Sequence, residues 1–455
     1  MVEIIKRNKA LSVSPLKSSQ PIGASLAFLG MNKTMPMLHG SQGCTAFSKV
    51  FFVRHFREPI PLQTTAMEQI STIMGADANV IEGLKTLYDK AKPELVGVIT
   101  TGLSDVQGVD IKRVIREFRQ LHPQCHDMQI VPVNAPDFIG CLETGFAISV
   151  ITLIDELVPI VPQRIIENIN NQQINVLVGS FLTPSDVEYI KEVIMYFGLN
   201  PVVLPDLSDS LDGHTTDIEF TPLTFGGTSV HSLNQLHTAK ATLVIGHALF
   251  KAADLLKSHT KVPDFRFESL LGLAAFDRFL MTLQEISGNP VPAQLTRQRA
   301  QLQDAMLDTH FMLGQARIAI AADPDELYSF SRVLTDMGAD IVAAVTTVKS
   351  SILQQIPTTQ VKIGDLEDLE RLAYEQKAQL LIGNSHAVDT AKRLAIPILR
   401  AGFPQYDYVG GYQRLWIGYQ GTRNLLFDLA NLLLNHHANH EIKPYRSIYA
   451  EKIAC

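Results

Sequence analysis

The chain is poor in cysteine and has no runs of basic residues. Its four cysteines, Cys44, Cys125, Cys141 and Cys455, are scattered over 455 residues. So few and so widely spaced thiols argue against a disulfide framework and indicate a reducing, cytoplasmic compartment. Lys and Arg number 39 against 46 Asp and Glu. This mildly acidic balance predicts no nucleic-acid partner.

Several signatures of catalysis and of membrane insertion are missing as well. The sequence contains no P-loop, no dinucleotide-binding GxGxxG after a strand, and no CxxC, HExxH or GxSxG motif. The N-terminal segment lacks the apolar core of a signal peptide. The most apolar window, residues 146–162, is short and interrupted by Asp155 and Glu156, so it predicts a buried helix and no membrane partner.

Short apolar runs that alternate with helical segments recur along the chain. Such runs are typical of parallel strands buried on both faces, and here they predict strands at 95–100, 128–133, 174–179, 201–204, 241–246, 317–322, 340–345, 379–383 and 396–399. We therefore predict an α/β fold of three Rossmann-like subdomains with parallel sheets, at residues 1–165, 166–312 and 313–455. Ligands are expected in clefts beyond the carboxyl ends of the strands.

The stretch 37–59 combines a lone thiol with an unusual context. Cys44 follows Gly40 and Gly43, and this glycine content predicts a turn rather than a helix interior or a central strand. An apolar segment and a cluster of Arg54, His55 and Arg57 come next. A buried structural cysteine and a cofactor edge at an interface both fit this pattern. We interpret the charged cluster as a folded interface network rather than a catalytic group.

The other thiols and the histidines give weaker signals. Cys125 lies on a loop away from the carboxyl ends of the strands, which favours a surface or packing role. Cys141 follows a strand-end loop and is better placed for a ligand. A histidine group near the C-terminus fits a solvated helix end better than a metal site; its members are His436, His437 and His440.

Six motifs together resemble the nitrogenase component 1 family on its β-subunit side. They span nearly the whole chain in the family's order and lie at residues 19–24, 39–44, 54–59, 99–101, 286–292 and 382–385. The family's catalytic β subunit binds an eight-iron P-cluster through three cysteines with a nearby serine. The cysteine positions correspond to Ser19, Cys44 and Gly102, and the serine position corresponds to Asp137. Only Cys44 keeps the ligand.

With these departures the chain resembles the β-like subunit of the scaffold that matures the iron–molybdenum cofactor. The missing N-terminal extension adds to this resemblance. The resemblance implies a subunit that is not itself an enzyme. Gly102 would leave space for a smaller cluster, Ser19 would be a turn residue, and Asp137 would be either a hard oxygen ligand or a hydrogen-bonding loop residue.

A 4Fe–4S cluster normally needs four protein ligands, so Cys44 alone predicts a cluster shared with a second chain. The resemblance implies an α-like partner that supplies three cysteines and holds the cofactor precursor, in a heterotetramer with two copies of each chain. The nitrogenase iron protein would supply electrons, and apo-nitrogenase component 1 would receive the cofactor. Two alternatives remain open. One is a diverged catalytic β subunit, of a molybdenum nitrogenase or of a protochlorophyllide-type reductase, and the other is a cluster-free structural subunit.

Overall fold

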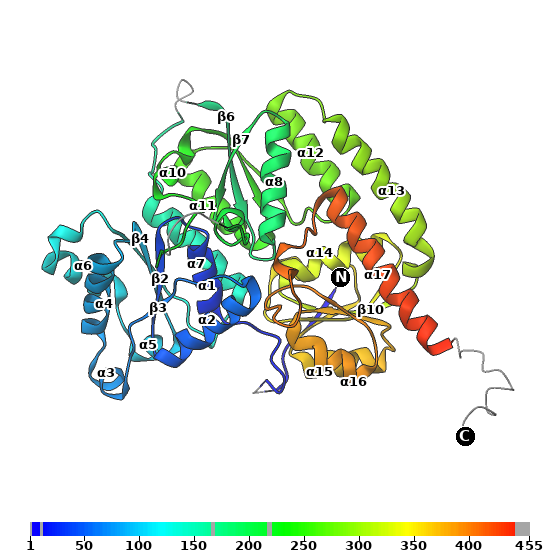
Figure 1. Cartoon of the computed structure of the whole chain (residues 1–455), viewed down its shortest axis with the longest axis horizontal. Coiled ribbons are helices and arrows are strands. Elements are labelled where there is room, and N and C mark those ends of the chain that lie inside the picture. The colour runs from blue at the N-terminus through cyan, green and yellow to red at the C-terminus, as the bar shows by residue number, and fades with distance from the viewer. Residues whose placement is uncertain (1, 10–11, 165–168, 216–220, 442–455) are drawn as a thin grey trace.

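Three parallel sheets form the framework of the chain in the computed structural model (Figure 1). The structure describes residues 2–9, 12–164, 169–215 and 221–441. The strands of each sheet pair in parallel, and helices connect them and cover their faces. The predicted α/β fold with three Rossmann-like units is therefore confirmed. No helix in the described ranges has both the length and the apolar character needed to cross a membrane.

The first sheet leads into the segment that carries Cys44. Its strands, in sheet order, are β3 (Gln63–Thr64), β2 (Thr34–His39), β4 (Leu95–Thr100) and β5 (Gln129–Val133). Alternate strand residues face opposite sides, so Leu38 and Ile99 pack under one helix pair and Met37 and Val98 under another. The first pair is α1 (Gln20–Leu29) with α7 (Leu142–Leu157), and the second is α4 (Asp77–Lys90) with α6 (Ile111–Leu121).

The second and third sheets repeat this scheme. The second consists of β7 (Asn200–Leu204), β6 (Asn170–Val178), β8 (Ala239–Ile245) and β9 (Asp264–Phe267). The third consists of β1 (Glu3–Ile5), β12 (Gln360–Ile363), β11 (Asp340–Thr346), β10 (Arg317–Ala322), β13 (Leu380–Gly383) and β14 (Ile398–Arg400). Helices of the second unit are α8 (Pro184–Tyr196), α9 (Leu207–Ser210), α10 (Val230–Asn234), α11 (Phe250–Thr260), α12 (Leu273–Ser287) and α13 (Ala293–Leu313). Those of the third are α14 (Pro324–Asp336), α15 (Leu366–Glu375), α16 (Val388–Leu394) and α17 (Gly418–Glu441).

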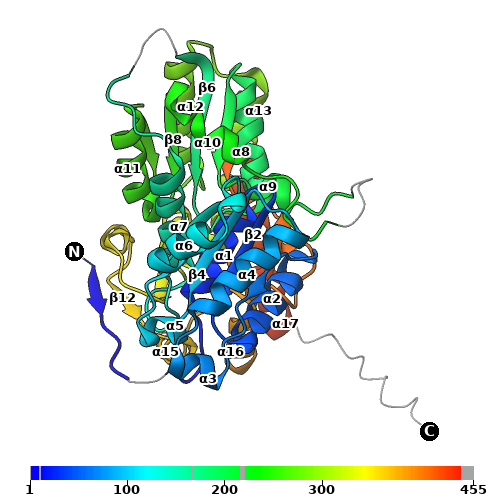
Figure 2. The same cartoon turned by 90° about the vertical axis from the view of Figure 1, so that its left-hand side faces the viewer.

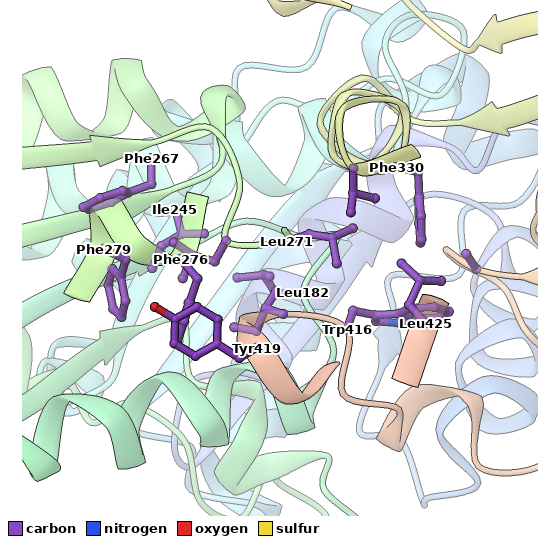
Figure 3. Close-up of a cluster of buried hydrophobic side chains, with 14 of the residues drawn as sticks. Leu182, Ile245, Phe267, Leu271, Phe276, Phe279, Phe330, Trp416, Tyr419 and Leu425 are labelled. Atoms are coloured by element: carbon purple, nitrogen blue, oxygen red, sulfur yellow. The ribbon is translucent and has the colours of Figure 1, made fainter. Parts of the chain in front are cut away.

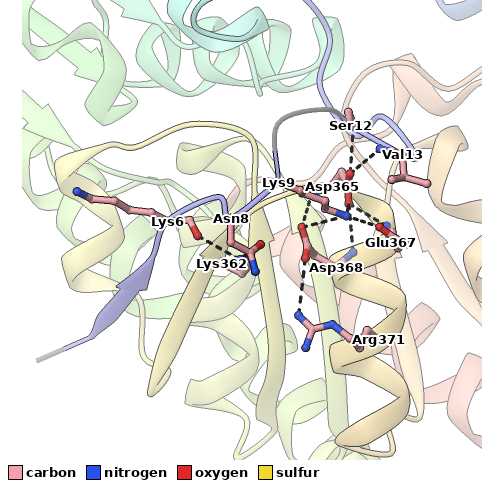
Figure 4. A network of polar contacts seen from close by, with 10 residues as sticks. All are labelled: Lys6, Asn8, Lys9, Ser12, Val13, Lys362, Asp365, Glu367, Asp368 and Arg371. Carbon is pink, nitrogen blue, oxygen red and sulfur yellow. Dashed lines mark hydrogen bonds and ion pairs between the residues drawn. The ribbon is translucent and has the colours of Figure 1, made fainter.

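The N-terminal residues belong to the third sheet rather than to the first. Strand β1 pairs in parallel with β12, although we expected an irregular arm here (Figure 2). The arm that follows is held by the N-terminus of α15 (Figure 4). The Lys9 ammonium lies 2.8 Å from Asp365 Oδ1, and the Val13 amide donates to Asp365 Oδ2 at 2.9 Å. The first strand of the predicted unit 1–165 therefore belongs to the sheet of the unit predicted at 313–455.

A continuous hydrophobic cluster joins the second and third units (Figure 3). The Phe276 and Tyr419 rings meet edge to face at 4.9 Å, and Phe330 meets Trp416 in the same way at 5.3 Å. The buried Asp186 carboxylate accepts the backbone N–H groups of Trp416 and Ile417 at 2.7 and 3.1 Å. These contacts fix the start of α17 against the second unit.

The stretch 37–59 differs from the sequence prediction. Thr34–His39 form the fully buried strand β2, which we did not predict. Pro36 in its interior removes a ladder donor and so weakens the local strand signal. Helix α2 (Gln42–Phe56) follows at once, where we expected a turn. Cys44 therefore lies in the first turn of a helix that begins at the carboxyl end of a central strand.

Candidate functional site

Cys44 lies at the carboxyl edge of the first sheet with its side chain exposed. Ser41 is the N-cap of α2, and its hydroxyl donates to Cys44 Sγ at 3.3 Å instead of capping the helix backbone. A helix N-terminus stabilises negative charge, and so does a hydroxyl donor. Both features suit the negative charge that a cysteine sulfur carries when it is bound to iron. The alternative of a buried structural cysteine at this position is wrong.

Exposed apolar side chains lie on α2 after this thiol and in the loop after β5, a feature that we did not predict. Phe47 and Val50 follow Cys44 on α2 and are 71% and 50% exposed. Phe138 and Ile139, in the loop after β5, are 58% and 53% exposed. The spacing of three between Cys44, Phe47 and Val50 places them on one side of the helix, and this was the available sequence signal.

Asp137 occupies the space that we expected to be open beside Gly102. Its Oδ1 accepts the Gly102 N–H at 3.1 Å, at the start of α5 (Gly102–Gln107). A Cβ at position 102 would lie 2.1 Å from that oxygen. The expectation that glycine leaves room for a cluster is wrong, because the carboxylate fills the room. The Asp137 side chain has the hydrogen-bonding role that we predicted as one of its two alternatives.

This contact predicts the outcome of restoring a cysteine at position 102. Gly102→Cys is expected to destabilise the protein by about 2 kcal/mol, because the new Cβ must displace a carboxylate. Asp137→Ala removes the obstacle, so the double variant is expected to melt above the Gly102→Cys single variant. Thermal melting of the wild type and the three variants measures this coupling. Losses that simply add in the double variant would contradict it.

Ser19 and Cys141 lie at the starts of helices α1 and α7. Ser19 is the N-cap of α1, where we expected a turn residue. Cys141 is the N-cap of α7 and is fully buried. Burial raises the pKa of the Cys141 thiol well above its usual value, and the nearby Asp323 adds to the shift. Cys141 is therefore a neutral packing group within this chain.

The remaining candidates are also accounted for by packing or lie outside the description. Cys125 is fully buried in the core beneath α6, so the packing role is confirmed, and burial raises the pKa of its thiol. His436 lies in α17, whereas the side chains of His437 and His440 and all of Cys455 fall outside the described residues. Within the described ranges, no group of three His, Cys, Asp or Glu side chains could hold a metal ion.

The charged cluster at the C-terminal end of α2 contacts the third unit of the same chain. Arg54 stacks over the Tyr406 ring at 4.5 Å, and Arg57 donates to the Tyr406 carbonyl at 3.2 Å. His55 Nδ1 accepts the Gln405 N–H at 2.9 Å. Burial lowers the pKa of His55 to about 3, so the ring is neutral. This network fixes the far end of α2, whose first turn carries the thiol.

One cavity between the units, where we expected a cleft, is small. Its volume is about 60 Å³, and its lining includes His55, Asp323 and Glu326. A water molecule occupies roughly 30 Å³ of the liquid, so the cavity has room for a few waters. That is far less than a multi-iron cofactor needs. The exposed edge at Cys44 is the better candidate site.

The comparisons with known proteins identify the family of the chain. The family model of nitrogenase component 1 type oxidoreductases matches residues 19–434. The nitrogenase iron-molybdenum cofactor biosynthesis protein NifN of Nostoc sp. is 45% identical over 428 residues, covering 94% of each chain. The NifN protein of Klebsiella pneumoniae is 42% identical over 447 residues, covering 98% of this chain and 96% of the relative.

A solved structure shows the same fold. The structure described as "Nitrogenase Cp1 at pH 6.5" superposes with a TM-score of 0.88 and 29% identity, covering 97% of this chain and 98% of that one. The resemblance inferred from the six sequence motifs is thus confirmed over the length of the fold. The chain belongs to the nitrogenase component 1 type oxidoreductase family.

Proposed function

We propose that this chain is the β-like subunit of the scaffold on which the nitrogenase iron–molybdenum cofactor is matured. The names of its relatives support the pathway, since the proteins that share 45% and 42% of its residues are cofactor biosynthesis proteins. The chain acts as an assembly subunit of the cytoplasm rather than as an enzyme in its own right. It takes part in assembling the cofactor that nitrogenase needs for nitrogen fixation and does not itself reduce dinitrogen.

Cys44 supplies one ligand to a 4Fe–4S cluster that is shared with the partner subunit. The observation that carries this role is an exposed thiol in the first turn of a helix, on a surface rich in apolar side chains. The described part of the chain brings no second cysteine to this edge, because Cys125 and Cys141 are buried elsewhere. One thiol fits a cluster whose other ligands come from a second chain. When bound, the cluster relays electrons.

The partner is a NifE-like α subunit that provides three cysteines and holds the cofactor precursor. Two copies of each chain form the heterotetramer. The nitrogenase iron protein supplies electrons, and apo-nitrogenase component 1 receives the finished cofactor. Phe47 and Val50 on α2, with Phe138 and Ile139 in the loop after β5, expose apolar surface that suits contact with a second chain.

The Cys44→Ala variant tests this function directly. The chain is co-expressed with its α-like partner, and the purified complex is analysed for iron and for the EPR signal of the reduced cluster. We expect the variant to lose the cluster's share of iron, about four atoms per copy of the chain, together with its signal. Cys125→Ala is the matched control, since it removes a thiol that is buried in the core.

Two results would contradict the proposal. Iron content and EPR signal that are unchanged in Cys44→Ala would remove the ligand role and leave a cluster-free structural contact. Dinitrogen or protochlorophyllide reduction by the purified complex would show a catalytic β subunit instead. A Cys125→Ala complex with normal iron makes the loss in Cys44→Ala specific to its position.

A further inference from the structure

Threonine hydroxyls hold the two residues that lead from strand β2 into helix α2. The Thr101 hydroxyl donates to the His39 carbonyl at 2.9 Å, from the loop after β4. Thr65 Oγ1 accepts the Gly40 N–H at 3.3 Å, from the loop after β3. The Thr64 hydroxyl donates to the Gly40 carbonyl, also at 3.3 Å. Side chains from both neighbouring strands therefore hold the backbone at this point. We call Thr64, Thr65 and Thr101 the threonine clamp.

The clamp is buried and closely fitted. Thr65 and Thr101 are 5% and 1% exposed, and His39 is fully buried. His39 Nδ1 lies 2.9 Å from Thr65 Oγ1, and burial lowers the pKa of this histidine to about 4, so the ring stays neutral. A Cβ on Gly40 would lie 2.5 Å from Thr101 Oγ1. Only glycine therefore lets the clamp close around the backbone.

The clamp ends where the thiol-bearing turn begins. Ser41 is the N-cap of α2, and Cys44 is the third residue of that helix. The Ser48 hydroxyl donates to the Cys44 carbonyl at 2.9 Å, so the turn is also held from the helix side. Both ends of the short segment between Gly40 and Cys44 are thus fixed by hydrogen bonds within the chain. A ligand held in place beforehand costs less conformational entropy on binding.

We propose that Thr65 and Thr101 are positioning residues that orient Cys44 for its cluster by fixing the Gly40 backbone. This inference rests on the proposed function, because it assigns the ligand to Cys44. Thr65→Val and Thr101→Val keep the side-chain shape and remove the hydroxyl. Each leaves a backbone group at Gly40 or His39 without its hydrogen bond. The turn should then open more often, while the cluster is retained less firmly.

Hydrogen exchange of the amides at residues 40–44 measures the clamp itself in the purified heteromeric complex. Loss of one buried hydrogen bond is expected to speed their exchange about tenfold in either variant. Thr183→Val is the matched control, since Thr183, like Thr101, is a helix N-cap whose hydroxyl donates to a remote carbonyl, that of Arg414 at 2.9 Å. Thr101→Ser retains the hydroxyl and is expected to exchange like the wild type.

Cluster release to an iron chelator, with the EPR line shape, measures the consequence for the ligand. We expect the two valine variants to release iron several-fold faster than Thr183→Val and to show an altered line shape. Exchange rates equal to those of Thr183→Val would overturn the clamp. Faster exchange with unchanged iron release and line shape would overturn the positioning role. Iron that survives Cys44→Ala is a separate outcome, which refutes the proposed function.

Discussion

Gly23→Ala is expected to destabilise the protein by about 3 kcal/mol, although alanine favours helices. Helices α1 and α7 cross with their backbones in contact. A Cβ at position 23 would lie 1.8 Å from the Leu142 carbonyl oxygen, and one at Gly145 would lie 2.0 Å from the Gln20 carbonyl oxygen. The obstacle is main chain on both sides, so a change of rotamer cannot relieve it. The two helices must move apart.

The melting temperature of the complex measures this effect, and we expect a fall of about 3 °C for Gly23→Ala. Gly43→Ala is the matched control. Position 43 is also helical, but its Cβ would meet only Ser41 Oγ, at 4.0 Å. Alanine there should leave the melting temperature unchanged or raise it slightly. Equal melting temperatures for the two variants would show that the crossing is looser than the structure indicates.

The strands that the sequence predicted well are those that bury both faces. The predicted strands at 95–100 and 317–322 match β4 and β10 residue for residue. The missed strands β1, β3, β9 and β12 have four residues or fewer, too short for an apolar run to stand out. Strand β2 was missed for a different reason. Pro36 stands in its interior, and tertiary pairing with β4 overrides that local signal.

The candidate site was predicted only in part, because some of its contacts join residues that are far apart in the sequence. The position of Cys44 followed from its glycine context and the family motif, whereas its exposure did not. The contact between Asp137 and Gly102 joins residues 35 apart, and no local pattern encodes it. The threonine clamp has the same character, since Thr65 and Thr101 reach the thiol-bearing segment only after the sheet has formed. Long-range side-chain contacts of this kind are visible only in the folded chain.

Buried acids at the junction of the units predict a second large effect, on stability against pH. Glu143 on α7 reaches the start of α14, where its Oε2 accepts the Asp325 N–H at 2.8 Å. Asp325 in turn accepts the Ala248 N–H of the second unit at 2.9 Å. Burial raises the pKa of Glu326 to about 8 and that of Asp325 to about 7, and it also raises the pKa values of Glu143 and Asp323.

The direction of the effect follows from proton uptake. Each raised acid keeps its proton in the folded state after the unfolded chain has released it, so stability falls as pH rises toward the folded-state pKa. The buried histidines act in the opposite sense. Burial lowers the pKa of His39 to about 4 and that of His55 to about 3, so their contribution falls as the pH drops below about 6.5. Above that pH the contribution of these two histidines is complete, and the raised acids should make stability decrease between about pH 6.5 and 8.

Glu326→Gln isolates one of these acids. The amide resembles the protonated carboxyl in shape and cannot ionise. A substitution of equal size is needed because Glu326 lies against Gly402, where added volume would not fit. From its folded-state pKa of about 8, Glu326 accounts for about 2 kcal/mol of the decrease between pH 6.5 and 8, so the variant should lose stability less steeply over that range. Melting temperatures of the complex across these pH values give the slope. Glu285→Gln, an exposed change on α12, is the control and should keep the wild-type slope. If Glu326→Gln has the same slope as Glu285→Gln, Glu326 is ionised in the folded protein, and the junction must neutralise its charge by another group.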